Sequence, residues 1–190
     1  MNTPNKLTVF RMLITPVFLA IILWNIPHRF LFALIIFSIA AVTDAVDGKL
    51  ARKNNEVTVF GKLLDPIADK MLTTAALLAF MQLGWCNVWI VIIILTREFA
   101  VTSIRLIASS QGVVIPANIW GKLKTVSQMT FTIVIMLLGE LDMTFHIFIK
   151  AVNFGLPVVS NILLWITAVL TVVSGVIYIM QSRKLIDFSK

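Results

Sequence analysis

Four aspartates lie within two stretches of sequence that are otherwise apolar enough to enter a membrane. Asp44 and Asp47 fall in the first stretch, and Asp65 and Asp69 fall in the second. A charged side chain at the centre of a bilayer costs about 2.5–3.5 kcal/mol on insertion scales, so four uncompensated carboxylates would cost on the order of 10 kcal/mol. A chain that folds around such a cluster must neutralise it, and bound divalent metal is the simplest means.

The composition indicates an integral membrane protein. Of its 190 residues, 59% are hydrophobic and 13% are charged, and the mean hydropathy is +0.96. We expect one all-α membrane domain over residues 1–190, with six transmembrane helices. Apolar stretches long enough to span a bilayer occur at 8–25, 30–51, 60–83, 88–109, 118–139 and 155–181.

The basic residues predict how the chain is oriented. Most lysines and arginines near the expected helix ends fall at one set of ends, whereas Arg29 and Lys150 fall at the other. Because cytoplasmic segments carry the excess of Lys and Arg, we expect a multi-pass protein of the cell membrane with both termini in the cytoplasm. The net charge of +7 favours anionic membrane lipids and phosphorylated substrates as partners. A nucleic-acid partner is not expected, because these charges lie at membrane depth or on short loops.

Helical spacing places each pair of aspartates on one face of its helix. Residues three or four positions apart lie about 4.5–6 Å apart along a helix axis, on the same side. If the second helix ends near Arg52 and the third begins near Val59, both pairs lie at a similar depth inside the cytoplasmic edge. Two antiparallel helices joined by a short loop would then bring all four carboxylates together.

An all-oxygen site of this kind suits Mg²⁺ or Mn²⁺ rather than Zn²⁺. Four carboxylates can hold two such ions, an arrangement that stabilises the attacking and leaving oxygens of a phosphoryl-type displacement. The alternative interpretation is that the aspartates form salt bridges with Lys62, Lys70 or Arg97. That interpretation requires as many cations at the right height as there are acids.

Small residues and an arginine accompany the aspartates. Gly48, Ala51 and Gly61 remove side-chain bulk where a diphosphate, a base or a facing helix could approach closely. Arg52 offers a fixed fork of donors that suits a phosphate oxygen. Taken alone, the small residues are more typical of tight helix packing.

A second group of charges lies on the fourth and fifth expected helices. Arg97, Arg105, Lys122 and Lys124 are cations in or near the membrane, with Glu98 close by in sequence. Intramembrane charges suggest a functional site, and we expect Arg105, Lys122 and Lys124 to bind the phosphate of an acceptor. Arg97 either joins them or has a structural partner. The two lysines could instead extend to the interface from a helix end. Arg97 and Glu98 are adjacent in sequence, so we expect them on different helix faces and not as a simple intrahelical pair.

The string from Asp44 to Asp69 matches every defined position of the DxxDGxxAR and GxxxDxxxD signature, with eight residues between Arg52 and Gly61. In this, the chain resembles the CDP-alcohol phosphatidyltransferase family. Further segments resemble its bacterial phosphatidylglycerophosphate synthase branch, and the likeness is weakest beyond about residue 140. Those segments are PNKLTVFR at 4–11, LDPIADK at 64–70, REFAVTSIR at 97–105 and GKLKT at 121–125.

The resemblance implies an all-α fold of six transmembrane helices around a polar cavity that faces the cytoplasm, usually as a homodimer. It also implies a two-metal centre that transfers a phosphatidyl group from CDP-diacylglycerol to sn-glycerol 3-phosphate, giving phosphatidylglycerol phosphate and CMP. It implies that the four aspartates bind the metals and that Asp69 is also the general base. The residues implied to contact the CDP-lipid are Asn5, Thr8, Gly48, Ala51, Arg52 and Gly61.

Two alternatives remain. The acceptor could be another alcohol, such as inositol phosphate or serine, because sequence separates these poorly. The protein could also be a cation transporter, because transporters use membrane aspartates as well. Such transporters typically contain an inverted repeat and broken helices, and this sequence shows neither feature clearly.

Overall fold

The computed structural model describes residues 3–54, 59–113, 115, 118–147 and 155–183, and within these it contains six helices and no strand. For residues 3–6, 44–54, 59–66 and 69 it describes the backbone but not the side chains. The helices are α1 (Thr3–Leu23), α2 (Arg29–Asn54), α3 (Val59–Gln82), α4 (Val88–Ser110), α5 (Ile119–Phe145) and α6 (Leu156–Ser182).

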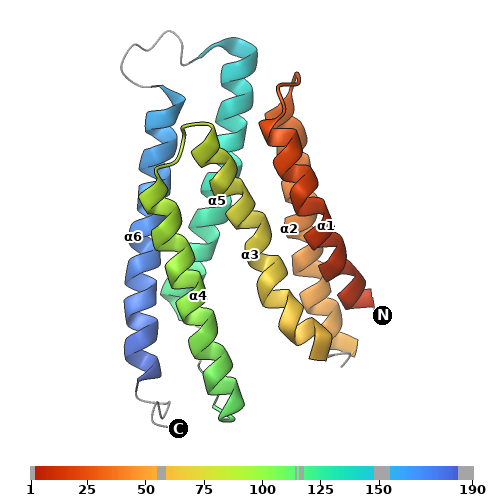
Figure 1. The fold of residues 1–190 in the computed structure, drawn as a ribbon, viewed down its shortest axis with the longest axis vertical. Helices are drawn as coiled ribbons and strands as arrows, with labels where there is room; N and C mark the ends of the chain where they lie inside the picture. Colours follow the sequence, from red (N-terminus) through yellow and green to blue (C-terminus); the bar gives the residue numbers. More distant parts are fainter. Residues whose placement is uncertain (1–2, 55–58, 114, 116–117, 148–154, 184–190) are drawn as a thin grey trace.

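The helices form an elongated bundle in which α1 lies against both α2 and α3, and α6 lies against both α4 and α5 (Figure 1). Helix α5 also contacts α2, and so joins the two halves. The start of α1 and the end of α6 lie at the same end of the bundle (Figure 1). We call this the inner end, and the end that carries the α1–α2 and α3–α4 turns the outer end. The all-α prediction is confirmed.

Two asparagines set the start of α4 and α5. The side-chain oxygen of Asn87 accepts a hydrogen bond from the Trp89 backbone N–H at 3.0 Å, and that of Asn118 accepts one from Trp120 at 3.2 Å. Each cap satisfies one of the backbone donors that the first turn of a helix leaves without a partner. The same Asn-x-Trp pattern therefore begins both helices.

Two glycines with left-handed backbone conformation follow the ends of α3 and α4. Gly84 has a φ of 76° and Gly112 a φ of 71°, values that residues with a Cβ adopt only with strain. Beside them, the Trp85 N–H donates to the Phe80 carbonyl and the Val113 N–H donates to the Ala108 carbonyl, both at 2.8 Å. These bonds satisfy carbonyls of the last turn, so each glycine ends its helix within a short turn.

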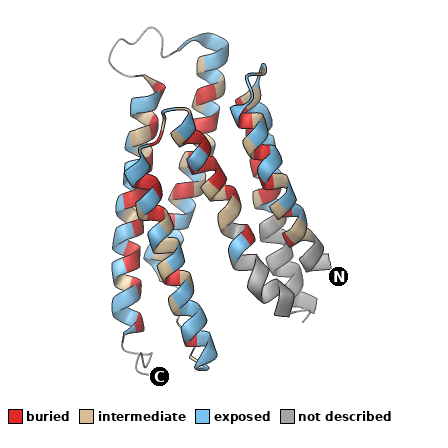
Figure 2. Ribbon diagram, viewed as in Figure 1, coloured by how far each residue is buried: buried red, intermediate tan, exposed pale blue. Residues whose placement is uncertain are grey.

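The interior of the bundle is apolar and aromatic, and so is much of its surface. Phe18, Phe37 and Phe80 are completely buried. In contrast, Val126, Val169 and Met180 expose 61%, 58% and 63% of their area, and exposed positions run along the length of the helices (Figure 2). Large exposed apolar residues occur on all six helices. Exposed apolar area on this scale is characteristic of a surface that contacts lipid or a partner.

Two of the described helices, α5 and α6, are long and apolar enough to cross a membrane by themselves. Shorter apolar helical segments run from Leu7 to Leu23 and from Arg29 to Thr43. Six helices are therefore present at the expected places. Within the described residues, only α5 and α6 are both long and apolar enough to span a membrane.

Helix α5 continues to Phe145, six residues beyond the end expected at 139. Glu140, the first residue beyond the expected span, has partners in the structure. Its carboxylate accepts a hydrogen bond from the Leu31 N–H at 3.2 Å and lies 2.5 Å from Nδ1 of His28. His28 has a φ of 57° in the α1–α2 turn. The acid therefore joins the end of α5 to the start of α2.

Cys86 packs into the outer end of the core, as its apolar neighbours in the sequence suggest. It is 6% exposed, and burial raises the pKa of its thiol to about 12. The thiol is therefore protonated at neutral pH.

Gly139 lies against a pair of aromatic rings that are tilted relative to each other. The Phe30 and Trp85 ring centroids are 4.9 Å apart, and a Cβ at position 139 would lie 2.9 Å from Trp85 and 3.2 Å from Phe30. Because both rings are packed and rigid, we expect Gly139→Ala to destabilise the fold by about 1–3 kcal/mol through overpacking. Thermal unfolding of the detergent-solubilised protein measures the loss.

Gly121→Ala provides the matched control on the same helix. A Cβ there would lie 3.7 Å from Arg97, an ordinary contact distance, and alanine is favoured over glycine in a helix by about 0.5–1 kcal/mol. We expect this variant to be as stable as the parent or more so. Equal unfolding temperatures for the two variants would contradict the packing argument.

Candidate functional site

A cavity of about 580 Å³ opens in the inner half of the bundle, and residues from all six helices line it. The described part of its lining includes one carboxylate, Glu98, and six cationic side chains. The cations are Arg11, Lys70, Arg97, Arg105, Lys122 and Lys124. This described part of the wall therefore carries a net positive charge, which suits an anionic ligand.

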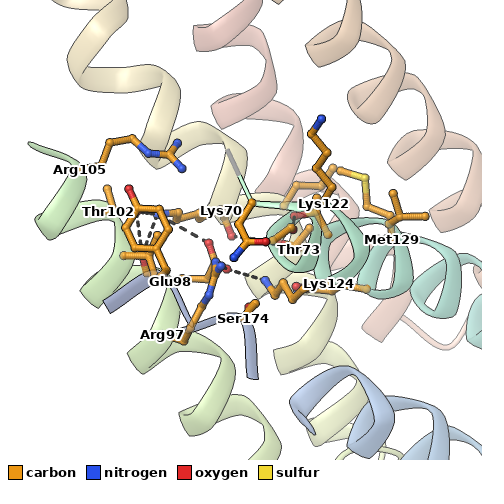
Figure 3. A pocket seen from close by; sticks show the side chains of 18 of the residues that line it. Lys70, Thr73, Arg97, Glu98, Thr102, Arg105, Lys122, Lys124, Met129 and Ser174 are labelled. Atoms are coloured by element: carbon orange, nitrogen blue, oxygen red, sulfur yellow. Dashed lines mark hydrogen bonds and ion pairs between the residues drawn. The ribbon is translucent and has the colours of Figure 1, made fainter. Parts of the chain in front are cut away.

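Glu98 of α4 is the centre of an ion-pair network (Figure 3). Its Oε1 lies 2.5 Å from Nζ of Lys124 and 3.0 Å from Nη1 of Arg97, and its Oε2 lies 3.7 Å from Nζ of Lys70. The Lys124 side chain is 4% exposed, and a buried ammonium requires a close anionic partner. Lys124 is therefore held inside the bundle and does not extend to the interface.

Lys70 is fixed to the backbone of α4. Its ammonium donates to the Glu98 carbonyl at 3.0 Å and also contacts the Thr102 hydroxyl. The Thr102 hydroxyl in turn donates to the same carbonyl at 2.7 Å. Since Lys70 directly follows Asp69 in sequence, these contacts hold the aspartate-bearing part of α3 beside α4.

Two glycines leave room for Arg97. A Cβ at Gly175 of α6 would lie 3.0 Å from Cγ of Arg97, and one at Gly121 of α5 would lie 3.7 Å from its terminal nitrogen. The arginine stem thus passes along α6 while its guanidinium reaches α5. The expectation that Arg97 and Glu98 do not pair within one helix was wrong, because the long guanidinium turns back to the carboxylate of the next residue.

Arg105 and Lys122 line the same cavity but lie outside the Glu98 network (Figure 3). Both are exposed, and within the described part of the chain neither forms an ion pair. The structure therefore brings together all four cations expected to bind an acceptor. Two of them, Arg97 and Lys124, are bound to Glu98. The other two, Arg105 and Lys122, are available to a ligand.

The residues expected to bind the CDP-lipid are mostly outside the described side chains. Thr8 is buried on α1, and it is absent from the cavity lining that the structure describes. For the others the structure gives the helix but not the side chain. Asn5 lies on α1, Gly61 lies on α3, and Gly48, Ala51 and Arg52 lie on α2.

The side chains of Asp44, Asp47, Asp65 and Asp69 also lie outside the description, but their backbone is helical. Asp44 follows the cavity-lining Ala40 and Ala41 on α2, and Asp69 precedes the cavity-lining Lys70 on α3. Their donor atoms are carboxylate oxygens, the ligands that Mg²⁺ and Mn²⁺ prefer. The residue types and their helical spacing therefore fit divalent ions. Elsewhere, the described side chains contain no group of three or more potential metal ligands.

Several residues of the cavity were not identified from sequence as part of a site, and three of them matter most for its chemistry. Lys70 was considered only as a possible salt-bridge partner of the aspartates, while Thr102 and Tyr178 were not considered. Glu98 and Thr102 are four residues apart, so they share a helix face, and this spacing was the available signal. Tyr178 is the one tyrosine of the chain and lies in a helix that contains no charged residue.

Comparison with known proteins identifies a family and several relatives over most of the chain. The family described as CDP-alcohol phosphatidyltransferase matches residues 1–173. The chain is 41% identical over 186 residues to the CDP-diacylglycerol–glycerol-3-phosphate 3-phosphatidyltransferase of Bacillus subtilis, covering 92% of this chain and 91% of the relative.

Two further relatives come from distant bacteria. One is the enzyme of the same name from Rickettsia bellii, 35% identical with 96% of both chains covered. The other is a probable phosphatidylglycerophosphate synthase of Mycobacterium tuberculosis, 35% identical with 96% of this chain and 82% of the relative covered. The match extends over most of the chain in every case, so the protein belongs to the CDP-alcohol phosphatidyltransferase family.

Proposed function

We propose that this protein transfers the phosphatidyl group of CDP-diacylglycerol to sn-glycerol 3-phosphate, giving phosphatidylglycerol phosphate and CMP. The observation that carries this proposal is the cationic cavity beside the aspartate-bearing helices. The printed names of the relatives, which specify glycerol 3-phosphate as acceptor, support the same reaction.

The charge of the cavity favours a phosphorylated acceptor. The described lining holds six cations and one carboxylate, and three of those cations are paired with that carboxylate. A phosphate monoester with close to two negative charges would balance Arg105 and Lys122, which form no ion pair among the described residues. Serine is a zwitterion without net charge, so it would leave these two cations uncompensated. The cavity alone does not distinguish glycerol phosphate from inositol phosphate, and for that choice the relatives are the support.

The residues have distinct roles in the proposed reaction. Arg105 and Lys122 bind the acceptor phosphate, and Lys124 contributes the N–H groups that Glu98 leaves available. Arg97 adds positive charge while Glu98 holds it in place. Asp69 accepts the proton of the acceptor hydroxyl as that oxygen attacks the lipid-side phosphorus. The new phosphorus–oxygen bond replaces the bond to CMP, which leaves as the phosphate monoester.

Asp44, Asp47, Asp65 and Asp69 would hold divalent metal, which we propose to be two Mg²⁺ or Mn²⁺ ions. When bound, such ions neutralise the diphosphate charge and stabilise the departing phosphate oxygen. The helical spacing of the four residues and the all-oxygen donor set support this assignment. Gly48, Ala51, Arg52 and Gly61 would accommodate the cytidine and diphosphate, with Asn5 and Thr8 nearby.

We also propose that all six helices cross the cell membrane, with the inner end in the cytoplasm. The start of α1 and the end of α6 lie at that same end, and every helix exposes large apolar residues; both observations support this topology. Soluble glycerol 3-phosphate would then reach the cavity from the cytoplasm while the CDP-lipid enters from the membrane. The resemblance to the family supports a homodimer.

The reaction can be tested with an acceptor panel. Purified protein in detergent micelles, supplied with CDP-diacylglycerol and Mg²⁺ or Mn²⁺, is expected to release CMP with sn-glycerol 3-phosphate. Release with inositol phosphate or serine is expected to be at background level. CMP release that depends on inositol phosphate and not on glycerol phosphate would overturn the acceptor, and no release with any acceptor would overturn the transferase.

A further inference from the structure

One hydroxyl group in the cavity wall lacks a partner. The side chain of Tyr178 on α6 is 4% exposed and lines the cavity, and within the described structure its buried hydroxyl makes no hydrogen bond. A buried hydroxyl left without a partner is unfavourable, and such groups in native proteins call for an explanation.

The other described hydroxyls of the cavity wall are already occupied. Each donates to a carbonyl in the preceding turn of its own helix, at distances between 2.7 and 3.3 Å. They belong to Thr73, Thr102, Thr125 and Ser174. Tyr178 differs because its hydroxyl is at the end of a long rigid ring and cannot reach its own backbone. Its partner must come from another element or from a ligand.

The surroundings of Tyr178 indicate what that ligand group is. Helix α6 packs against α4, which contributes Arg97, Val101 and Arg105 to the same cavity wall. The cations suit the acceptor phosphate. Asp69, the expected base, directly precedes Lys70, which lines the cavity from α3. A phenol hydroxyl is uncharged and both donates and accepts, so it suits a neutral hydroxyl better than a phosphate.

We propose that the Tyr178 hydroxyl binds the secondary hydroxyl of the glycerol phosphate acceptor, at C2, and thereby selects acceptors that carry it. This inference rests on the proposed function. Of the three functional parts of that acceptor, the phosphate pairs with cations and the primary hydroxyl reacts, which leaves the C2 hydroxyl for Tyr178. A buried site built to hydrogen-bond a substrate hydroxyl discriminates strongly against an analogue that lacks it.

The test compares sn-glycerol 3-phosphate with 3-hydroxypropyl phosphate, which has the reacting hydroxyl and the phosphate but no C2 hydroxyl. For the parent enzyme we expect kcat/KM to be about 10- to 100-fold higher with glycerol phosphate. In Tyr178→Phe, which removes one oxygen atom, this ratio should fall to about 1 to 3. The decrease should come from glycerol phosphate, while the KM for CDP-diacylglycerol stays within about twofold.

Thr167→Val is the control on the same helix. Thr167 is completely buried, its hydroxyl donates to the Leu163 carbonyl at 3.3 Å, and the described cavity lining does not include it. This variant should retain the discrimination of the parent. An unchanged ratio in Tyr178→Phe, an equal loss with both acceptors, or a parent enzyme that does not discriminate would each overturn the inference. Failure of the parent to use glycerol phosphate would instead overturn the proposed function.

Discussion

Replacing Asp69 with asparagine is expected to lower the rate of CMP release by about 100- to 10,000-fold, the range that a general base contributes. Asparagine has nearly the same size and keeps one oxygen ligand, but it cannot take up the proton of the acceptor. We therefore expect binding of CDP-diacylglycerol to be largely retained. Turnover at saturating concentrations of both substrates, with equilibrium binding of labelled CDP-diacylglycerol in micelles, measures the two effects separately.

Asp142→Asn is the matched control, because it makes the same substitution near the outer end of α5, far along the helix from the cavity-lining positions 121–129. It should release CMP at the parent rate. If Asp69→Asn retained half or more of the parent rate, Asp69 would not be the base. If it lost binding of the CDP-lipid together with turnover, its main contribution would be to the metal site.

The positions of the helices could be predicted well because local signals mark them. Asn87 and Asn118 are good N-caps, and Gly84 and Gly112 occupy turns that favour glycine. The end of α5 could not be predicted, because it depends on a contact between distant residues. The expected span stopped at 139, and only the folded chain shows that His28 and Leu31 provide partners for Glu140.

The cation group of the site could also be predicted, but its internal organisation could not. Arg97, Arg105, Lys122 and Lys124 were expected together and line one cavity. Which of them are paired depends on how α3, α4 and α5 meet around Glu98, a contact between three helices that periodicity does not reveal. The roles of the aspartates stay a prediction, since their side chains lie outside those described.

The Glu98 network determines which cations of the cavity are free to bind a ligand. Arg97, Lys124 and Lys70 share one carboxylate inside the bundle, so part of their charge is already compensated and their positions are fixed. Arg105 and Lys122 are exposed and form no ion pair among the described residues, so a ligand phosphate gains more from them. Truncation of an unpaired cation should therefore affect acceptor binding with little disturbance of the fold.

Arg105→Ala is accordingly expected to raise the KM for sn-glycerol 3-phosphate by about 10- to 100-fold, since a hydrogen bond to a charged group contributes about 1.5–3 kcal/mol. The KM for CDP-diacylglycerol should change by about twofold or less. Arg105→Lys should be intermediate, because lysine keeps the charge but loses the planar fork that binds two phosphate oxygens. Initial rates of CMP release, with each substrate varied in turn, measure these constants.

Arg183→Ala is the appropriate control, because Arg183 is an exposed arginine at the end of α6 and is not among the described residues that line the cavity. It should leave both KM values unchanged. Salt provides a second criterion: Arg105 is exposed, so its attraction for phosphate is screened as ionic strength rises. The KM for glycerol phosphate should therefore rise with salt in the parent and less steeply in Arg105→Ala. An equal salt dependence in the two proteins, or an unchanged KM, would mean that Arg105 serves membrane topology and not the acceptor.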